Sequence, residues 1–417
     1  MLPVREGKLQ RRLGAVAILL VLGAARGAAA DVTIDSSASI LVWPKIISDG
    51  THDTVIQLSN TSNSVVRAHC FYVNAALTDP SQPPGPLNPP LWLETDFDIV
   101  LTRQQPSYWY AHLGRTVDPS DNSCDPRVRA CRYRGFDPGL IPPVPPGFEG
   151  ELKCVQVDDS GAPLSGNNLI GEATIVRGLR FPPESGDVVF TDESNYTALG
   201  ILGIDNNGDG ELVLGGGQCA VSGDVCGNDE DCGDAGPCVL EYNACPAAWI
   251  LNHPADGAPD TFLNQVQLGE VDATIHTELT IVPCTQNFET QVPTTVTVQF
   301  LSWNEFESQF SVSTSITCWG NFRLADIGAP ALTIDGQPTR DKFGTMFMQT
   351  RMRSAAGSPY GMLMVAEEFH ASKPSRFSDE RPDIIVTRVG VGAANLHVEG
   401  QRTVPDLITI PADQVGR

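Results

Sequence analysis

The sequence predicts an all-β protein built from two antiparallel β-sandwich-like domains with a disulfide-rich insertion between them. Apolar and polar residues alternate with a period of two over many short segments, which is the pattern of a strand with one buried face. Thr, Val and aromatic residues dominate these segments, and no window of helical length carries an apolar stripe. Gly, Pro, Asn and Asp separate the segments at short intervals, as in antiparallel sandwiches.

Two pairs of neighbouring segments illustrate the alternation. Residues 53–60 and 65–74 flank the polar turn 61–64. Residues 294–303 and 310–318 flank a second short connection. Each pair has apolar side chains at every second position, so each pair predicts a β-hairpin. Further strands are predicted at residues 275–284, 343–353 and 360–370.

The first 30 residues predict a cleavable signal peptide. A basic head that ends at Arg11 and Arg12 is followed by the apolar run 13–25 and by small residues directly before Asp31. The apolar run is shorter than the about 20 residues that span a membrane. We therefore expect a secreted or periplasmic protein with no membrane span.

The chain carries 50 acidic and 27 basic residues, which gives a net charge of −23 at pH 7. A field of that sign repels nucleic acid and anionic membrane surfaces. We therefore expect neither of them to be the main partner.

The length of 417 residues exceeds what a single hydrophobic core usually serves, so two domains are expected. We predict an N-terminal domain at 31–214, a cysteine-rich insertion at 215–245 and a C-terminal domain at 246–417. Proline-rich stretches at 80–90 and 138–147 predict loops within the first domain, because proline cannot donate a ladder hydrogen bond.

An arginine-rich segment is the candidate binding patch. Arginine beside aromatic rings suits an anionic glycan, through bidentate hydrogen bonds and stacking. The alternative is that these arginines only compensate the surrounding acidic surface. The candidate ligand-binding residues are Arg103, Trp109, Arg127, Arg129 and Arg132.

A calcium loop is a second candidate site. Asp205, Asn207 and Asp209 offer oxygens at the first, third and fifth positions of a loop that continues with Gly210. The position of the closing bidentate acid is occupied by Gly216, so a strand-connecting turn is the favoured interpretation. No cofactor other than this structural Ca²⁺ is suggested.

The methionines after the signal peptide all lie between Met346 and Met364. We expect them to form the core face of a terminal hairpin. Thioethers gathered in an exported protein can also bind Cu(I), which keeps a periplasmic metal-binding protein as an alternative.

Two short motifs are similar to those of the trypsin-like proteases. His69 stands in the sequence RAHC, and Ser160 stands in DSGAP. However, Asp158 occupies the place of the glycine that helps to form the oxyanion hole, and the histidine lies on an ordinary strand. Because triads are recognised by geometry rather than by short motifs, no catalytic residue is predicted.

Short segments spread over the chain carry a family resemblance. They are SNTSNS with AHCFYVNA (59–75), GELKC (150–154), YNACP (242–246), TELTIVPC (277–284) and FLSWNEFE (300–307). They resemble a family of uncharacterised exported bacterial all-β proteins. The resemblance implies a secreted all-β fold and no particular activity, and it implies that residues 217–239 are a small cysteine-rich insertion.

The eleven cysteines are expected to form disulfides, as is usual in exported proteins. The insertion implied by the resemblance would close two bridges among Cys219, Cys226, Cys232 and Cys238, and Cys245 would belong to the parent fold. The further expected pairs are Cys70 with Cys154, Cys124 with Cys131, and Cys284 with Cys318. Cys245 is then the unpaired thiol. Zinc is not expected, because the insertion lacks paired C-x₂-C units.

These observations favour a secreted binding or structural component of the cell exterior, with an anionic glycan or another surface protein as partner. The alternatives are an extracellular hydrolase and a periplasmic protein that binds copper or calcium.

Overall fold

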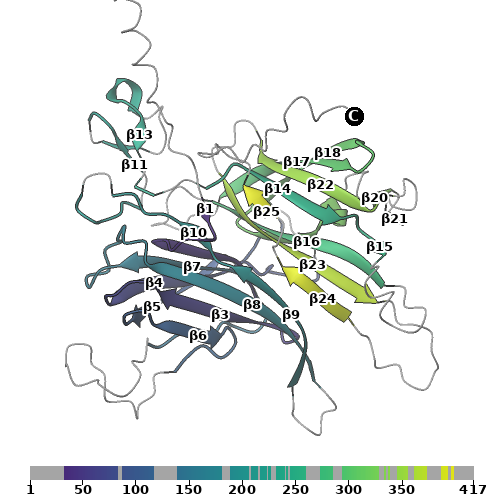
Figure 1. Ribbon diagram of the computed structural model, residues 1–417, viewed down its shortest axis with the longest axis horizontal. Coiled ribbons are helices and arrows are strands. Elements are labelled where there is room, and N and C mark those ends of the chain that lie inside the picture. Colours follow the sequence, from purple (N-terminus) through teal and green to yellow (C-terminus); the bar gives the residue numbers. More distant parts are fainter. Residues whose placement is uncertain are drawn as a thin grey trace, which may run out of the picture.

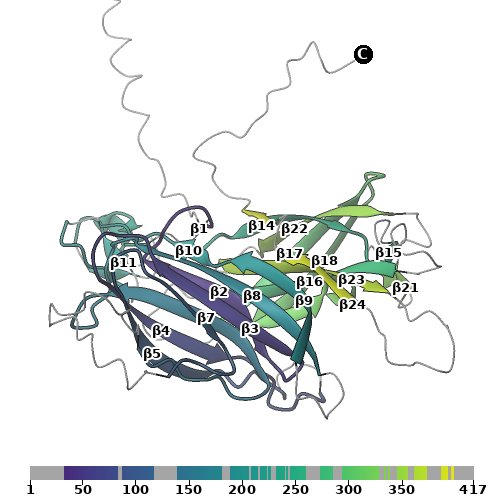
Figure 2. The same ribbon diagram turned by 60° about the horizontal axis from the view of Figure 1, so that its bottom comes forward.

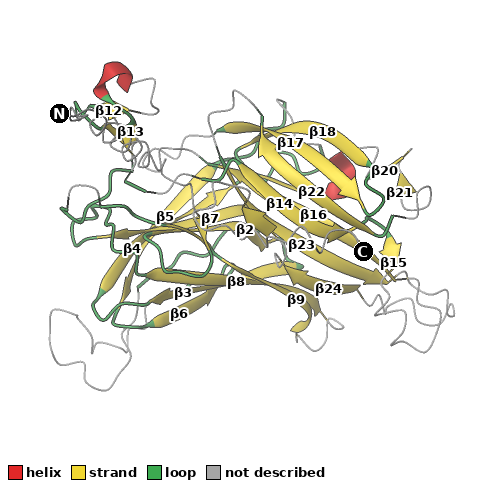
Figure 3. Cartoon of the chain, turned by 45° about the horizontal axis from the view of Figure 1, so that its top comes forward, coloured by secondary structure: helices red, strands yellow, loops and turns green. Residues whose placement is uncertain are grey.

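The computed structural model contains almost only strands, which confirms the predicted all-β class (Figure 3). The predicted signal peptide lies outside the described residues. The structure describes residues 32–82, 87–116, 139–180, 188–205, 208–214, 217–222, 224–226, 232–239, 241–242, 245–259, 273–284, 294–327, 333–334, 337–338, 345–355, 361–372, 387–392 and 396–398.

The N-terminal half is a sandwich of two sheets, which we call the central and the outer sheet (Figure 1). The central sheet has the order β1 (Val32–Thr33), β10 (Leu199–Ile201), β2 (Ile40–Ser48), β7 (Phe148–Val157), β4 (Val66–Asn74) and β5 (Leu93–Leu101). The outer sheet has the order β6 (Pro106–Tyr110), β3 (His52–Asn60), β8 (Leu169–Arg180) and β9 (Val188–Thr197).

The C-terminal half also contains two sheets, which we call the front and the inner sheet. The front sheet has the order β18 (Gln309–Thr317), β17 (Thr295–Asn304), β22 (Phe347–Ser354), β14 (Ala248–Pro254) and β25 (Leu396–Val398). The inner sheet has the order β15 (Ala258–Pro259), β16 (Ala273–Pro283), β23 (Met362–Ser372) and β24 (Thr387–Gly392), and β19 (Gly320–Arg323) also pairs with β16. The short elements are the 3₁₀ turn η2 (Leu324–Ile327) and the ribbon of β20 (Thr333–Ile334) and β21 (Gln337–Pro338).

The central sheet is covered on both faces. One core fills the space between the central and outer sheets and includes Trp43 and Leu58. A second core joins residues of the opposite face of the central sheet, such as Val42, to residues of the C-terminal half, such as Leu279 and Phe300. All nine residues of β2 are accordingly buried, as expected for a nearly uninterrupted apolar strand. The two halves therefore share a core across the central sheet. Figure 2 shows the strands of the two halves lying side by side.

The strand positions were predicted better than the strand pairing. The predicted hairpin at residues 294–318 is confirmed, because β17 and β18 pair from Thr295↔Thr317 to Trp303↔Gln309. The hairpin predicted at residues 53–74 is wrong. β3 pairs with β6 and β8 in the outer sheet, whereas β4 pairs with β5 and β7 in the central sheet. The turn between β3 and β4 therefore crosses from one sheet to the other.

The methionine segment likewise consists of two consecutive strands that belong to different sheets. β22 belongs to the front sheet and β23 to the inner sheet, so the expected terminal hairpin is not formed. The expected core face is confirmed, because Met348, Met352, Met362 and Met364 are all buried in the core that the two halves share.

The cysteine-rich insertion forms a small three-stranded unit that projects from the two sandwiches (Figures 1 and 3). It contains β11 (Gly217–Cys219), β12 (Val225–Cys226), the 3₁₀ turn η1 (Gly233–Ala235) and β13 (Cys238–Val239). The two bridges Cys219–Cys232 and Cys226–Cys238 close it internally, as expected. Three of their cysteines form a buried cluster separate from the larger cores, and the partly buried Cys238 packs against it.

Two further bridges tie the sandwiches. Cys70–Cys154 joins directly opposed positions of β4 and β7, as predicted. The expected Cys284–Cys318 pair is wrong, because Cys284 pairs with Cys245. The segment around Cys245 lies beside the end of β16, where Gly361 accepts from the Cys284 amide and Pro246 accepts from the Met362 amide. The predicted Cys124–Cys131 pair lies outside the described residues.

Cys318 is the free cysteine of the described part of the chain, and it is buried. It adopts a left-handed conformation (φ 67°) at the point where the chain leaves β18 in the front sheet for β19, which pairs with the inner sheet. Among the described residues, no helix is long and apolar enough to cross a membrane.

The thiol of Cys318 allows a test of this disulfide assignment. Burial raises its pKa to about 11, so we expect alkylation by iodoacetamide to be slow in the native protein and complete after unfolding without reduction. Peptide mapping by mass spectrometry should find the adduct on Cys318 and an intact Cys245–Cys284 bridge, with C318S as the unreactive control. A peptide that links Cys284 to Cys318 would contradict the assignment.

Candidate ligand site between the sandwiches

A bulge in β2 is the starting point of the candidate site. The pairing of β2 with β7 shifts register between Trp43 and Ile46, so Pro44 and Lys45 have no ladder partner there. The Tyr196 hydroxyl donates to the Lys45 carbonyl at 2.6 Å, and the Trp319 indole N–H donates to the Pro44 carbonyl at 2.7 Å. Side chains from β9 and from the C-terminal half thus satisfy the exposed backbone of the bulge.

The bulge directs the Lys45 side chain into the junction of the two halves. Its ammonium lies 2.6 Å from Glu367 Oε2 and 3.3 Å from Glu278 Oε2. Ser194 donates a further hydrogen bond to Glu367 Oε1. Lys45 therefore binds two carboxylates that both belong to the inner sheet.

Glu278 and Glu367 face each other directly in the register of β16 and β23. Like charges at directly opposed positions of neighbouring strands destabilise a sheet. The Lys45 ammonium reduces this repulsion by binding both carboxylates. Burial by itself lowers the pKa of Lys45, but the charges of Glu367 and Glu278 outweigh burial, so that the pKa is raised above its usual value.

A cavity of about 170 Å³ opens beside this ion cluster. Its volume corresponds to about six water molecules at the bulk volume of about 30 Å³ each. Four carboxylates and one ammonium line it, together with a histidine and a phenylalanine ring. The lining residues are Lys45, Ile47, Asp49, His52, Glu149, Ile175, Glu278, Asn321, Glu367 and Phe369.

Two of the carboxylates in this cavity have pKa values that are shifted in opposite directions. Burial favours the neutral form of Asp49, but hydrogen bonds from His52 and Thr51 outweigh it and lower the pKa of Asp49 to about 2. The His52 Nδ1 atom lies 2.7 Å from Asp49 Oδ2. Burial raises the pKa of Glu149, and the negative charges of Asp49 and Glu278 raise it further.

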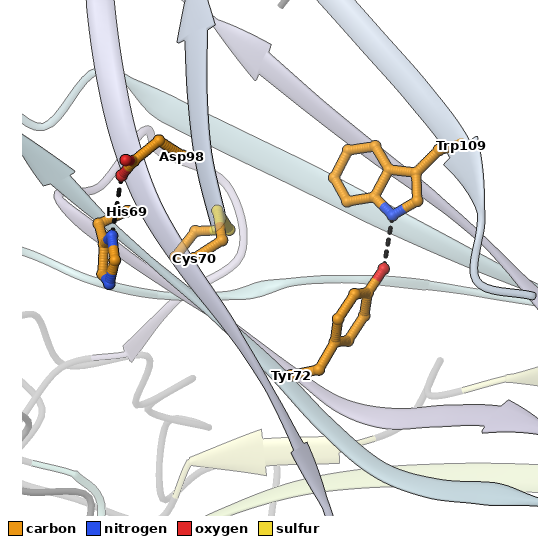
Figure 4. Close-up of a disulfide and its surroundings, with 6 residues drawn as sticks. His69, Cys70, Tyr72, Asp98 and Trp109 are labelled. Carbon is orange, nitrogen blue, oxygen red and sulfur yellow. Dashed lines mark hydrogen bonds and ion pairs between the residues drawn. A yellow bond between two sulfur atoms is a disulfide. The ribbon is translucent and has the colours of Figure 1, made fainter. Parts of the chain in front are cut away.

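The described residues cover only Arg103 and Trp109 of the predicted arginine and tryptophan patch. Trp109 is only 2% exposed and donates its indole N–H to the Tyr72 hydroxyl at 2.6 Å (Figure 4), so it is a core residue and its place in the patch was wrong. Tyr108, the preceding residue, points outward instead. Arg103 is exposed in the turn after β5, and Arg127, Arg129 and Arg132 lie outside the described residues.

The candidate calcium loop forms the hydrogen bonds of a turn. The Asp205 carboxylate accepts from the amides of Gly208 and Gly210, and Asp209 accepts from the amide of Glu211. Both glycines have positive φ angles, as the turn interpretation requires. Asn207 lies outside the described residues.

A metal centre finds little support in the described residues. The one group of His, Cys, Asp or Glu side chains close enough together to share an ion is Cys219, Cys226 and Cys232. These sulfur atoms are bonded in disulfides and offer no thiolate. The four methionines in the shared core pack against other apolar side chains.

The protease-like motifs do not form a catalytic contact, because no hydrogen bond joins His69 to Ser160 in the described part of the chain. The His69 Nδ1 atom lies 2.8 Å from Asp98 Oδ1 on the neighbouring strand β5 (Figure 4). The Ser160 hydroxyl instead donates to Asp158 at 2.7 Å within its own turn. The His69–Asp98 pair is thus a cross-strand contact on an exposed face, and Ser160 is engaged elsewhere.

The comparisons with protein-family models, with curated proteins and with solved structures find no match for this chain. The cavity beside Lys45 is therefore interpreted from its own residues. Sequence analysis missed it, although a single lysine within the apolar run of β2 was a usable signal, because lysine is almost never fully buried without a partner.

Replacing Lys45 tests its place in the junction. We expect Lys45→Met to lower the free energy of unfolding by about 3–5 kcal/mol at neutral pH, because the buried Glu367 carboxylate and the partly exposed Glu278 carboxylate lose their cation. The loss should shrink in acid, where the carboxylates become protonated. Denaturant titrations at several pH values measure both effects.

The wild-type protein should lose the stability that Lys45 contributes when the pH is raised far enough to deprotonate this lysine. Since the folded pKa of Lys45 is raised above its usual 10.5, its stabilising contribution is fully present below pH 10.5 and is lost as the pH rises through the folded value. Arg67→Met is the control, because Arg67 pairs with an exposed carboxylate, Asp159. Equal losses of stability in Lys45→Met and Arg67→Met would contradict the conclusion that Lys45 neutralises carboxylates at the junction of the two halves.

Proposed function

We propose that the protein is an exported binding protein that captures a cationic ligand in the cavity beside Lys45. The observation that carries this proposal is the charge of the cavity, in which four carboxylates face a single ammonium. A partly buried site with an excess of negative charge attracts a cation strongly, because water screens it less than at an open surface.

The existing contacts leave one carboxylate for the ligand. Asp49 pairs with His52, and Glu278 and Glu367 share Lys45. Within the part of the chain that the structure describes, Glu149 forms neither a hydrogen bond nor an ion pair through its side chain. Burial raises the pKa of Glu149, and the charges of Asp49 and Glu278 raise it further, so a ligand ammonium would pair with Glu149 first.

The size of the cavity restricts the ligand. Pockets for drug-sized molecules measure roughly 300–1,000 Å³, whereas this cavity measures about 170 Å³. It therefore suits a single head group, such as the ammonium or guanidinium group of a longer molecule. The Phe369 ring in the wall offers an apolar and cation–π contact to such a group.

The disulfides support an exported setting for this activity. Bridges form and persist in oxidising compartments, and the described residues contain four of them. A protein that meets free amines, cationic peptides or amino sugars outside the cytoplasm fits this chemistry.

One observation favours a hydrolase as the second candidate. A carboxyl group with a raised pKa and a carboxylate with a lowered pKa in one cavity is the arrangement used for acid and base catalysis. Against it, both oxygens of Asp49 already accept hydrogen bonds from Thr51 and His52. Turnover of glycosides or esters that Glu149→Gln abolishes would establish this second function.

Ligand pairs that differ only in charge test the binding function. We expect n-pentylamine and n-pentylguanidine, which are cations at neutral pH, to bind measurably in calorimetry, whereas the neutral n-pentanol and n-pentylurea do not. Glu149→Gln should weaken binding by about tenfold or more, since a charge-assisted hydrogen bond is lost. Asp96→Asn, which removes a carboxylate from β5 outside the cavity, is the matched control. No discrimination between the charged and neutral partners would refute the proposal.

The same variant should be more stable than the wild type at neutral pH. The folded state raises the pKa of Glu149, so its ionisation opposes folding as the pH rises through that value, and glutamine removes this penalty. Thermal unfolding at neutral and acidic pH measures the difference, which should vanish in acid. A variant that binds less and unfolds at a lower temperature would indicate structural damage instead.

A further inference from the structure

The outward face of the outer sheet carries a row of exposed side chains that crosses all four strands, which we call the outer row. In the register of the sheet, Gln57 on β3 lies between Tyr108 on β6 and Glu172 on β8. Thr197 on β9 lies opposite Glu172 and completes the row. Neighbouring strands are about 4.8 Å apart, so the row is about 14 Å long. All four side chains are exposed, whereas the opposite face of the sheet packs on the core of the N-terminal half.

The side chains of the outer row are available to a ligand. Within the part of the chain that the structure describes, none of the four forms a hydrogen bond or an ion pair through its side chain. Their neighbours on the same face are engaged. Asp53 on β3 binds the amide and the ring Nδ1 atom of His112, and Thr174 on β8 donates to Asn195 at 2.6 Å. Among the described side chains of this face, Glu172 is therefore the carboxylate without a partner.

The outer row combines an aromatic ring with hydrogen-bonding groups. Tyr108 is 63% exposed, so most of its ring is accessible. The hydroxyl groups of Tyr108 and Thr197 can each donate and accept a hydrogen bond, and the Gln57 amide offers two donors and an acceptor. These groups match the hydroxyls of a sugar, and an aromatic ring stacks on the apolar C–H face of a sugar ring. The composition of the row therefore suits a glycan.

The charge of this face restricts the kind of glycan. The strands β3, β6 and β9 contain no Lys or Arg, and those of β8 stand near its C-terminal end, at Arg177 and Arg180. The whole chain has a net charge of −23. An acidic polysaccharide is repelled by such a surface. A protonated amino group, in contrast, can form a charge-assisted hydrogen bond with the Glu172 carboxylate. Charge complementarity thus favours a glycan that carries amino groups.

We propose that the outer row binds a glycan chain that carries free amino groups. The Tyr108 ring stacks on one sugar unit, and Glu172 binds a protonated amino group of the chain. Gln57 and Thr197 exchange hydrogen bonds with sugar hydroxyls on either side of Glu172. None of these residues lines the cavity beside Lys45, so the proposal does not rest on the function proposed above.

Calorimetry with two oligosaccharides that share one backbone tests the proposal. The probe is the hexamer of β-1,4-linked glucosamine, and the reference is its fully N-acetylated form, which carries no charge. In mildly acidic buffer, where the amino groups of the probe are protonated, we expect the wild type to prefer the probe. Glu172→Gln should weaken binding of the probe by about tenfold or more and remove this preference. Asp96→Asn, which removes an exposed carboxylate from β5 in the central sheet, is the matched control and should bind like the wild type.

A second pair of variants separates stacking from charge. Tyr108→Ala should weaken binding of both oligosaccharides and keep the preference for the charged one, whereas Tyr108→Phe, which keeps the ring, should retain most of the binding. Thermal unfolding should stay unchanged, because both side chains are exposed.

Three results would overturn the proposal. The first is a wild type that does not prefer the charged hexamer, or a Glu172→Gln variant that keeps the preference. The second is binding that is lost in Glu149→Gln but kept in Glu172→Gln, which would place the amino sugar in the cavity and leave the function proposed above standing. The third is tighter binding of hexalysine than of the sugar, lost in Glu172→Gln, which would indicate a cationic peptide as the partner.

Discussion

The contact of Lys45 with Glu278 and Glu367 is the interaction on which the arrangement of the two sandwiches depends. The two glutamates oppose each other within the inner sheet, so the C-terminal half carries a pair of repelling charges at its own surface. The cation that relieves the repulsion comes from the N-terminal half, where a bulge in β2 presents it. A buried ion cluster stabilises weakly compared with apolar packing, but it strongly penalises any other relative position of the two halves. Apolar packing across the central sheet then contributes most of the stability.

The bulge shows how a local irregularity in one strand creates a contact between distant parts of the chain. Pro44 has no N–H, so a regular ladder hydrogen bond is already lost at that position. The freed carbonyl of Pro44 accepts from Trp319, and the backbone of Lys45 binds Tyr196. The other buried ion pair of the central sheet behaves differently. Glu151 and Lys153 both lie on β7, so their contact joins no separate elements and does not orient the halves. Only an ion pair that bridges two elements can fix their orientation.

The features that could be predicted from the sequence are the local ones. Alternation of apolar residues located the strands. The insertion that the resemblance implied grouped the four cysteines as the structure bonds them. Alternation does not reveal which sheet a strand joins, so the turn after β3 was taken for a hairpin although it crosses between sheets. The arginines near Trp109 in the sequence suggested that it lies at the surface. Burial alternates along β6, however, and Trp109 occupies a buried position of that strand. The candidate site was missed because Lys45 lies 233 and 322 positions before its two glutamates, and no local pattern connects them.

The same charges link stability to ligand capture. A carboxylate such as Glu149 that is partly buried without a cation opposes folding at neutral pH, so its presence is easier to explain by binding than by stability. A cation that enters the cavity would bind the folded state alone, and it would stabilise that state by mass action. Because the cavity is lined from both halves, by Glu149 on β7 and by Glu278 on β16, the ligand would also add a second link across the junction. Lys45 and the ligand would then neutralise one cluster together, with Lys45 as its permanent cation and the ligand as its exchangeable one.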